Sequence, residues 1–270
     1  MKTTVFLLLF SAQVVAQHHT RLNPATIEVH YRHTMQRDTV RRLATETDSM
    51  ILRIGASASQ FFSRHTFYYD SLWNDPDGRA TAEALTLEAF RTRDHSKEPR
   101  VGTTYDYLYK NYPAGRVTTT NEQFHVACRY DEATPSISWV VADSVRTILG
   151  HPCRMATADF RGRRWTAWFT TDIPISDGPW KLGGLPGLIL EAYDKGHQYT
   201  FTAVGLERVA EEPIIFTRPG GKNGYRTVDR RAFLKAKMFD LTHGGALGAS
   251  GLKSTDYEPI YMDLIERDYR

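Results

Sequence analysis

Apolar and polar residues alternate along much of the chain. In segment 27–33, Ile27, Val29 and Tyr31 fall on one face of an extended chain, and the residues between them are polar. The same period of two recurs in segments 124–130, 137–141, 165–169 and 199–203. Half-buried antiparallel strands produce this alternation because successive side chains point to opposite faces of the sheet. We therefore expect a mainly β protein built from antiparallel strands.

Turn residues separate several of these strands at short spacing. Arg161-Gly162 stands between segments 153–160 and 163–170, which predicts a hairpin. A second hairpin is predicted by Asp194-Lys195-Gly196, which stands between segments 188–193 and 198–206. Consecutive hairpins indicate an antiparallel meander.

Two helices are expected beside the sheet. Segment 81–93 has apolar residues at near-helical spacing after the breaker 75–78, and segment 229–241 follows Asp229, a suitable N-cap. We expect a strongly curved sheet with one or two helices, forming either a half-barrel or a small closed barrel. The fold resembles, by analogy alone, the half-barrels of lipoprotein carriers in the bacterial envelope.

Segment 178–194 has the most specific pattern of the chain, GPWKLGGLPGLILEAYD. Pro186 suits the second position of a tight turn, and Gly187 would supply the positive φ that the third position of a type II turn requires. The run 188–190 is apolar without alternation, which predicts a strand covered on both faces. This turn is either a corner that fixes a buried strand or a backbone that lines an opening for a ligand.

Aromatic residues in the same region are the other candidates for recognition. Trp165 and Trp168 are three residues apart and so face opposite sides of one strand, which leaves one in the core and the other either packed or exposed. If the region binds a ligand, the residues that would contact it are Trp168, Trp180, Gly184, Leu185, Pro186 and Gly187.

The N-terminus has the pattern of a secretory signal. Lys2 precedes a compact apolar run, and small or β-branched residues at 14–16 predict cleavage after Ala16. We expect residues 1–16 to be a signal peptide and residues 17–270 to form a single periplasmic or secreted domain. After residue 16 no apolar run reaches the ~18–20 residues of a membrane helix, so no transmembrane segment is expected.

Charge, cysteines and histidines limit the chemistry. A net charge of +3 gives no reason to expect nucleic acid binding. Cys128 and Cys153 form either a disulfide or two buried thiols, because an even cysteine count in an exported chain permits both. His30 and His33 fall on opposite faces of one strand and could not chelate a metal together. The sequence names no metal ligand set, no cofactor and no catalytic residues.

Segment 148–196 resembles the GLPGLI family, a group of secreted bacterial proteins of unknown function named for the hexapeptide at 184–189. The segment contains a Gly-x-x-Cys, an Arg-Gly-Arg turn, a Trp-Phe-Thr strand and a Gly-Pro-Trp turn. Segment 50–71 is also similar to the family's N-terminal half. The resemblance implies export, an association with the envelope of one bacterial phylum and proximity to outer-membrane transporters. It supplies no catalytic set.

Three hypotheses for function follow. The first is a non-enzymatic envelope protein that holds an apolar ligand, or a segment of an envelope or outer-membrane transporter protein, in the concave face of the sheet. The second is an envelope peptide hydrolase whose site is assembled from residues distant in sequence. The third is an exported metal-handling protein, which the ten histidines suggest.

Overall fold

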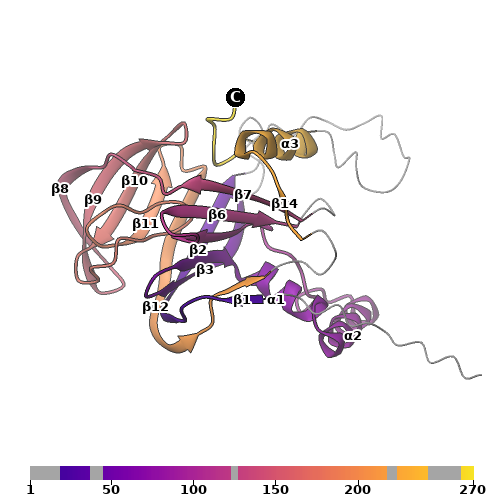
Figure 1. The fold of residues 1–270 in the computed structure, drawn as a ribbon. Coiled ribbons are helices and arrows are strands. Elements are labelled where there is room, and N and C mark those ends of the chain that lie inside the picture. Colours follow the sequence, from indigo (N-terminus) through magenta and orange to yellow (C-terminus); the bar gives the residue numbers. More distant parts are fainter. Residues whose placement is uncertain (1–18, 37–44, 123–126, 218–223, 243–262) are drawn as a thin grey trace, which may run out of the picture.

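The centre of the protein is an open, mainly antiparallel sheet of 12 strands (Figure 1). The computed structural model describes residues 19–36, 45–122, 127–217, 224–242 and 263–270. The strand order is β14-β7-β6-β5-β4-β3-β2-β12-β11-β10-β9-β8, and β1 and β13 form a separate two-stranded sheet. Within these residues the two edge strands, β14 and β8, do not pair with each other, so the sheet is not a closed barrel. The expected mainly β fold is confirmed.

The elements have the following bounds. The strands are β1 His19–Arg21, β2 Ala25–Gln36, β3 Thr45–Gly55, β4 Ser59–Ser63, β5 Tyr107–Lys110, β6 Arg116–Asn121, β7 Cys128–Ala133, β8 Val140–Ile148, β9 His151–Phe160, β10 Arg163–Thr170, β11 Leu188–Asp194, β12 Tyr199–Glu212, β13 Ile215–Thr217 and β14 Arg226–Thr227. The helices are α1 Arg64–Trp73, α2 Pro76–Thr92 and α3 Arg230–Thr242.

Both predicted hairpins form. β9 pairs with β10 around Arg161 and Gly162, whose φ angles of 53° and 75° match a tight turn that follows the twist of the strands. β11 pairs with β12 around the turn at 194–197. Local turn chemistry therefore determines the connections in this half of the sheet.

The helices differ from expectation in number and in one boundary. The described residues contain three helices, and the first of them, α1, was not predicted. Helix α1 begins where the Ser63 side chain accepts a hydrogen bond from the Thr66 backbone. The expected helix at 81–93 starts earlier, at Pro76. Asp75 caps it by accepting from the Gly78 backbone, so the apparent breaker is the helix start.

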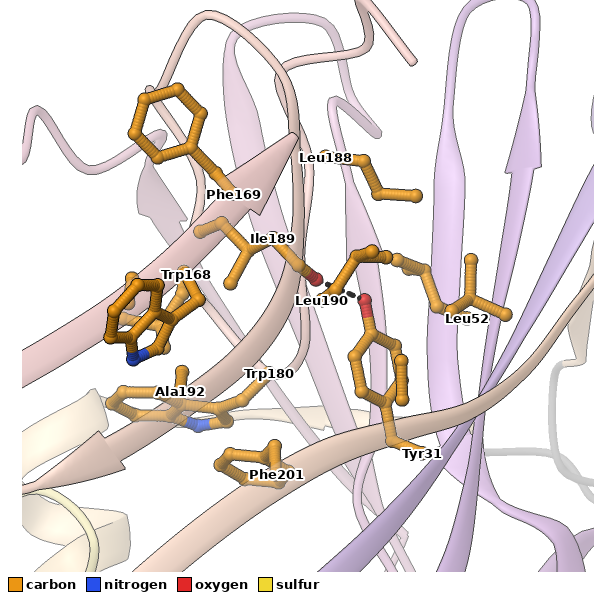
Figure 2. Packing of buried hydrophobic residues seen from close by; sticks show 14 of the residues in the cluster. Tyr31, Leu52, Trp168, Phe169, Trp180, Leu188, Ile189, Leu190, Ala192 and Phe201 are labelled. Carbon is orange, nitrogen blue, oxygen red and sulfur yellow. Dashed lines mark hydrogen bonds between the residues drawn. The ribbon is translucent and has the colours of Figure 1, made fainter. Parts of the chain in front are cut away.

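The main core lies between the concave face of the sheet and the segment that precedes β11. Tyr31, Trp165, Phe169 and Phe201 are almost completely buried in it. Leu188, Ile189 and Leu190 are fully buried, as the unalternating run predicted (Figure 2). Leu190 is the extra residue of a β-bulge, since Trp168 pairs with Glu191 and Phe169 pairs with Ile189. The bulge lets three consecutive apolar residues be buried.

Several predictions concern residues outside the described parts of the chain. The expected signal peptide at 1–16 lies there, as does the start of the strand expected at 124–130. None of the helices in the described parts combines the length and the hydrophobicity of a membrane-spanning segment.

Candidate functional site

A cavity of about 310 Å³ lies on the concave side of the sheet. Residues from β2, β3, β4 and β12 form its floor, residues 101–108 form one wall, and α3 with residues 264–265 forms another. Most of the lining is apolar or aromatic. The lining residues are His33, Met35, Met50, Phe61, Val101, Gly102, Thr103, Thr104, Tyr105, Asp106, Leu108, Trp180, Tyr199, Phe201, Lys237, Leu241, Leu264 and Ile265.

His33 is the unusual member of this lining. Its side chain is buried, its ring stacks on Phe201 with centroids 4.4 Å apart, and both ring nitrogens lack a hydrogen-bond partner among the described residues. Burial lowers the pKa of His33 to about 4, although the charge of Asp48 opposes this. His33 is therefore neutral at physiological pH and offers one donor and one acceptor without a net charge.

Asp48 faces His33 across the β2–β3 pair and fixes one wall of the cavity. Its Oδ2 accepts hydrogen bonds from the Thr103 backbone at 2.7 Å and the Thr103 hydroxyl at 3.0 Å. Its Oδ1 accepts from the Ser63 hydroxyl at 3.2 Å. A buried carboxylate with these partners is a structural anchor that holds residues 102–104 against the sheet.

The mouth of the cavity is bordered by one ion pair. Lys237 on α3 donates to Asp106 at 3.0 Å, and the Asn121 side chain donates to the other oxygen of Asp106 at 2.6 Å. Burial would raise the pKa of Asp106, but the Lys237 charge and these hydrogen bonds hold it below its usual value. The pair links α3 to residues that precede β5. The cavity therefore has an apolar interior and a polar border at α3.

The predicted recognition residues do not all come together. Trp180 lines the cavity, and its ring lies 5.6 Å from that of Trp165. Gly184 lines a separate hollow beside β5, while Leu185, Pro186 and Gly187 line neither. Leu185 is buried in the core instead. The hexapeptide thus contributes mainly to the core, where it leads into the buried strand β11.

Gly187 is required for space and not for a positive φ. The glycine of this segment with a left-handed backbone is Gly184, at φ 84°. A Cβ on Gly187 would lie 2.0 Å from the Thr170 carbonyl oxygen. The expected type II turn with positive φ at Gly187 is therefore wrong, and close approach to β10 explains the glycine.

Trp168 is largely buried and is packed away from the cavity. The Arg146 guanidinium lies 4.1 Å from the centre of its ring and pairs with Glu191 at 2.6 Å. Glu191 is also the cross-strand partner of Trp168. Trp168 thus supports a cation–π and ion-pair cluster on the other side of β10 from Trp165.

A buried ion cluster ties Trp180 and the C-terminal residues to the sheet. Lys181, which follows Trp180, donates to Glu266 at 2.6 Å and also pairs with Glu132. Burial alone would lower the pKa of Lys181, but the electrostatic interactions with Tyr130, Glu266 and Glu132 raise it overall. The cluster is completed by Arg161, Arg230 and Asp268. It fixes residues 264–265 in the cavity wall.

The two cysteines do not form a disulfide. Cys128 on β7 and Cys153 on β9 are both free thiols, and their strands stand in different halves of the sheet order. Burial raises the pKa of both thiols. The structure therefore contains the alternative of two unbonded thiols. Cys128 and Cys153 are only 25 positions apart in the sequence, but the strand order places β7 and β9 far apart in the sheet.

A second cavity, of about 270 Å³, lies between α1 and the strands β4 and β5. Two of the carboxyl groups that line it are each hydrogen-bonded to a tyrosine: Tyr107 donates to Asp70 at 2.6 Å and Tyr225 donates to Glu122 at 3.2 Å. Burial raises the pKa of Asp70 to about 6, with a smaller contribution from the Glu122 charge, while the Tyr107 hydrogen bond opposes it. Burial also raises the pKa of Glu122.

Comparisons with known proteins add a family likeness but no activity. Residues 155–191 match a family described as "Protein of unknown function (Porph_ging)". A search of curated proteins finds no match. Two crystal forms of PNGF-II are structurally similar at 11% identity, with TM-scores of 0.49 and 0.46 and with 78% and 82% of this chain covered. The chain spans about a third of the PNGF-II chain, 32% in both cases.

Proposed function

We propose that this protein is a non-enzymatic binding protein of the bacterial envelope, which holds a small apolar ligand in the concave-face cavity. The observation that carries the proposal is a preformed cavity of about 310 Å³ lined mainly by apolar and aromatic side chains. Small-molecule sites are concave, mostly apolar and supplied with few polar groups. The cavity has each of these properties.

His33 gives the cavity its polar recognition group. Because its pKa is about 4, it remains neutral, and an uncharged group buries at lower cost than an imidazolium. A ligand with an apolar body and one hydrogen-bonding group would pack against the apolar lining and pair with a ring nitrogen of His33. A charged ligand would fit this lining less well. Asp48 is already saturated by Thr103 and Ser63, which favours support of the wall over acid–base chemistry.

The envelope location is part of the proposal and rests on the sequence. The signal-like N-terminus and the resemblance of segment 148–196 to the GLPGLI family both favour export. The Porph_ging match at 155–191 falls inside that segment, so we infer that the two descriptions concern one family. A neighbouring outer-membrane transporter protein is then a reasonable partner.

Native mass spectrometry of protein purified from its own envelope tests the ligand directly. We expect a bound mass that denaturing conditions release, and a bare polypeptide mass would contradict the proposal. Binding of an uncharged apolar fluorescent probe, N-phenyl-1-naphthylamine, gives a second measurement. Leu241→Trp should narrow the cavity and weaken probe binding at least fivefold. Phe239→Trp, on the exposed side of the same helix, is the matched control and should leave binding unchanged.

The second cavity favours one alternative, an envelope hydrolase with a dispersed site. Asp70 and Glu122 are distant in sequence, and the raised pKa of Asp70, about 6, suits a general acid near neutral pH. Glu122 would then act as the base that activates water. This function requires the same cavity to accept a peptide or glycan segment beside Tyr107 and Tyr225.

Hydrolysis is tested with isolated envelope material as substrate and the release of new amino or reducing ends as readout. Asp70→Asn should abolish release, because an amide cannot donate the proton. Asp75→Asn is the control, since Asp75 borders the same cavity but caps α2. Equal rates for the wild-type protein and Asp70→Asn would eliminate this alternative.

A further inference from the structure

Three potential metal ligands meet on neighbouring strands outside both cavities. Glu28 and His30 lie on β2, and Glu207 lies on β12 directly opposite Glu28. His30 Nε2 is 3.1 Å from Glu28 Oε1 and 2.9 Å from Glu207 Oε1. All three ligand atoms lie within 4.8 Å of one another. Two carboxylate oxygens therefore converge on one imidazole nitrogen.

The charges of the two glutamates favour an additional cation at this place. Like charges directly opposite each other on paired strands destabilise a sheet. Arg53 compensates part of the Glu28 charge, because its Nε donates to Glu28 Oε2 at 2.9 Å. A terminal nitrogen of Arg53 also lies 3.3 Å from the carboxylate of Glu212. Glu28 Oε1 and Glu207 Oε1 still face each other around His30, and Arg53 fixes the orientation of the Glu28 carboxylate.

We propose that Glu28, His30 and Glu207 bind one first-row divalent transition-metal ion, with Zn²⁺ as the favoured ion. Zinc bonds to imidazole nitrogen and carboxylate oxygen at ~2.0–2.2 Å in tetrahedral geometry, so neighbouring ligand atoms stand about 3.3–3.6 Å apart. The separations of 3.1 and 2.9 Å from His30 Nε2 to the two carboxylate oxygens are slightly shorter, so small side-chain movements would open the trio around the ion.

The burial of the three ligands also suits a metal site. The Glu28 side chain is 9% exposed and rigidly held, whereas that of Glu207 is 58% exposed. A metal ion could therefore enter from solvent and keep water in its open coordination positions. The mixed nitrogen and oxygen donors favour zinc or manganese over calcium, and the lack of a thiolate in the trio disfavours copper(I).

The proposed site is independent of the proposed ligand cavity. His30 and His33 are three residues apart on β2, and His33 lines the cavity whereas His30 faces Glu28 and Glu207. Loss of the metal would leave the cavity lining unchanged. Absence of zinc binding would therefore leave the proposed apolar ligand unaffected. Absence of ligand binding would likewise leave the proposed metal site unaffected.

Isothermal titration of the purified, metal-free chain with zinc chloride tests the proposal. Other histidines of the chain can also take up zinc, so the site is counted as the difference between the wild-type protein and its variants. We expect Glu207→Gln and His30→Gln each to lose one zinc per chain, or to bind that zinc at least tenfold more weakly. Circular dichroism and thermal melting should show that both variants remain folded.

Asp172→Asn is the matched control. His151 and Asp172 form a partly exposed histidine–carboxylate pair elsewhere on the chain, 3.2 Å apart. The control variant should bind zinc as the wild-type protein does. The proposal is overturned if the wild-type chain shows no saturable zinc binding, or if Asp172→Asn weakens binding as much as Glu207→Gln does.

Discussion

The hydroxyl of Tyr31 on β2 donates a 2.6 Å hydrogen bond to the backbone carbonyl of Ile189 on β11 (Figure 2). β12 stands between these two strands in the sheet, but its pairing with β11 ends at Glu191 and Thr202. The tyrosine therefore supplies a partner where the ladder has stopped. Ile189 at the start of β11 is therefore held beside β10 by two further bonds, one from the Tyr31 hydroxyl to its carbonyl and one from its own N–H to the Asp177 carbonyl at 3.0 Å.

Removing this hydroxyl should destabilise the protein without changing its fold. Tyr31→Phe leaves the Ile189 carbonyl buried and lacking its tyrosine partner, which costs about 1–3 kcal/mol of unfolding free energy. Chemical denaturation measures the loss. Tyr193→Phe is the control, because Tyr193 is only partly buried and its ring stacks on His197. A change below 0.5 kcal/mol in Tyr31→Phe, on the order of a surface substitution, would contradict this role.

Gly187→Ala should be among the most damaging small substitutions in the chain. The added methyl would lie 2.0 Å from the Thr170 carbonyl oxygen, and backbone cannot move aside as a flexible side chain can. We expect a loss of about 3 kcal/mol or more, measured by denaturant titration. Gly115→Ala provides the comparison, since Gly115 has φ 75° and open space around it. Its cost should be only the backbone strain, about 1–2 kcal/mol.

The sequence contains most of the information about local structure in the second half of the chain. The alternation and the turn residues at 161–162 and 194–196 suffice to predict both hairpins, because their interactions are local. The reason for Gly187 could not be predicted, since the contact is with Thr170 on another strand. The bulge at Leu190 has the same origin: only the pairing with β10 reveals which residue is extra.

The candidate sites depend still more on long-range pairing. His33 appears in sequence as one of two histidines on a strand, and its burial follows from Phe201 and Asp48 on the two neighbouring strands. Glu28 and His30 share a face in the sequence pattern, but Glu207 joins them only through the pairing of β2 with β12. A sheet brings together residues separated by more than 170 positions, and no spacing rule encodes this.

The charge balance around Lys181 predicts a specific pattern of stability. Lys181→Met removes one cation from a buried cluster and leaves Glu132 and Glu266 with less compensation, which should cost about 3–5 kcal/mol. Lys181→Met combined with Glu266→Gln restores the balance and should recover part of that loss. Denaturant titration of both variants measures the difference. Equal or greater destabilisation of the double variant would show that charge compensation is not the cause.

Acid should destabilise the protein through His33. The pKa of His33 is about 4 in the folded chain and 6.5 for an unperturbed histidine, so the unfolded chain binds the proton more readily. The contribution of His33 to stability is therefore fully present above pH 6.5 and is lost as the pH falls towards 4. Complete loss corresponds to about 3 kcal/mol.

Chemical denaturation at pH 7.5 and at pH 4.5 measures this effect. The unfolding free energy should decrease less in His33→Phe, which cannot be protonated, than in the wild-type protein. The partly exposed His151, which pairs with Asp172, supplies the control. His151→Phe should retain the full wild-type decrease, and a decrease of equal size in His33→Phe would refute this assignment.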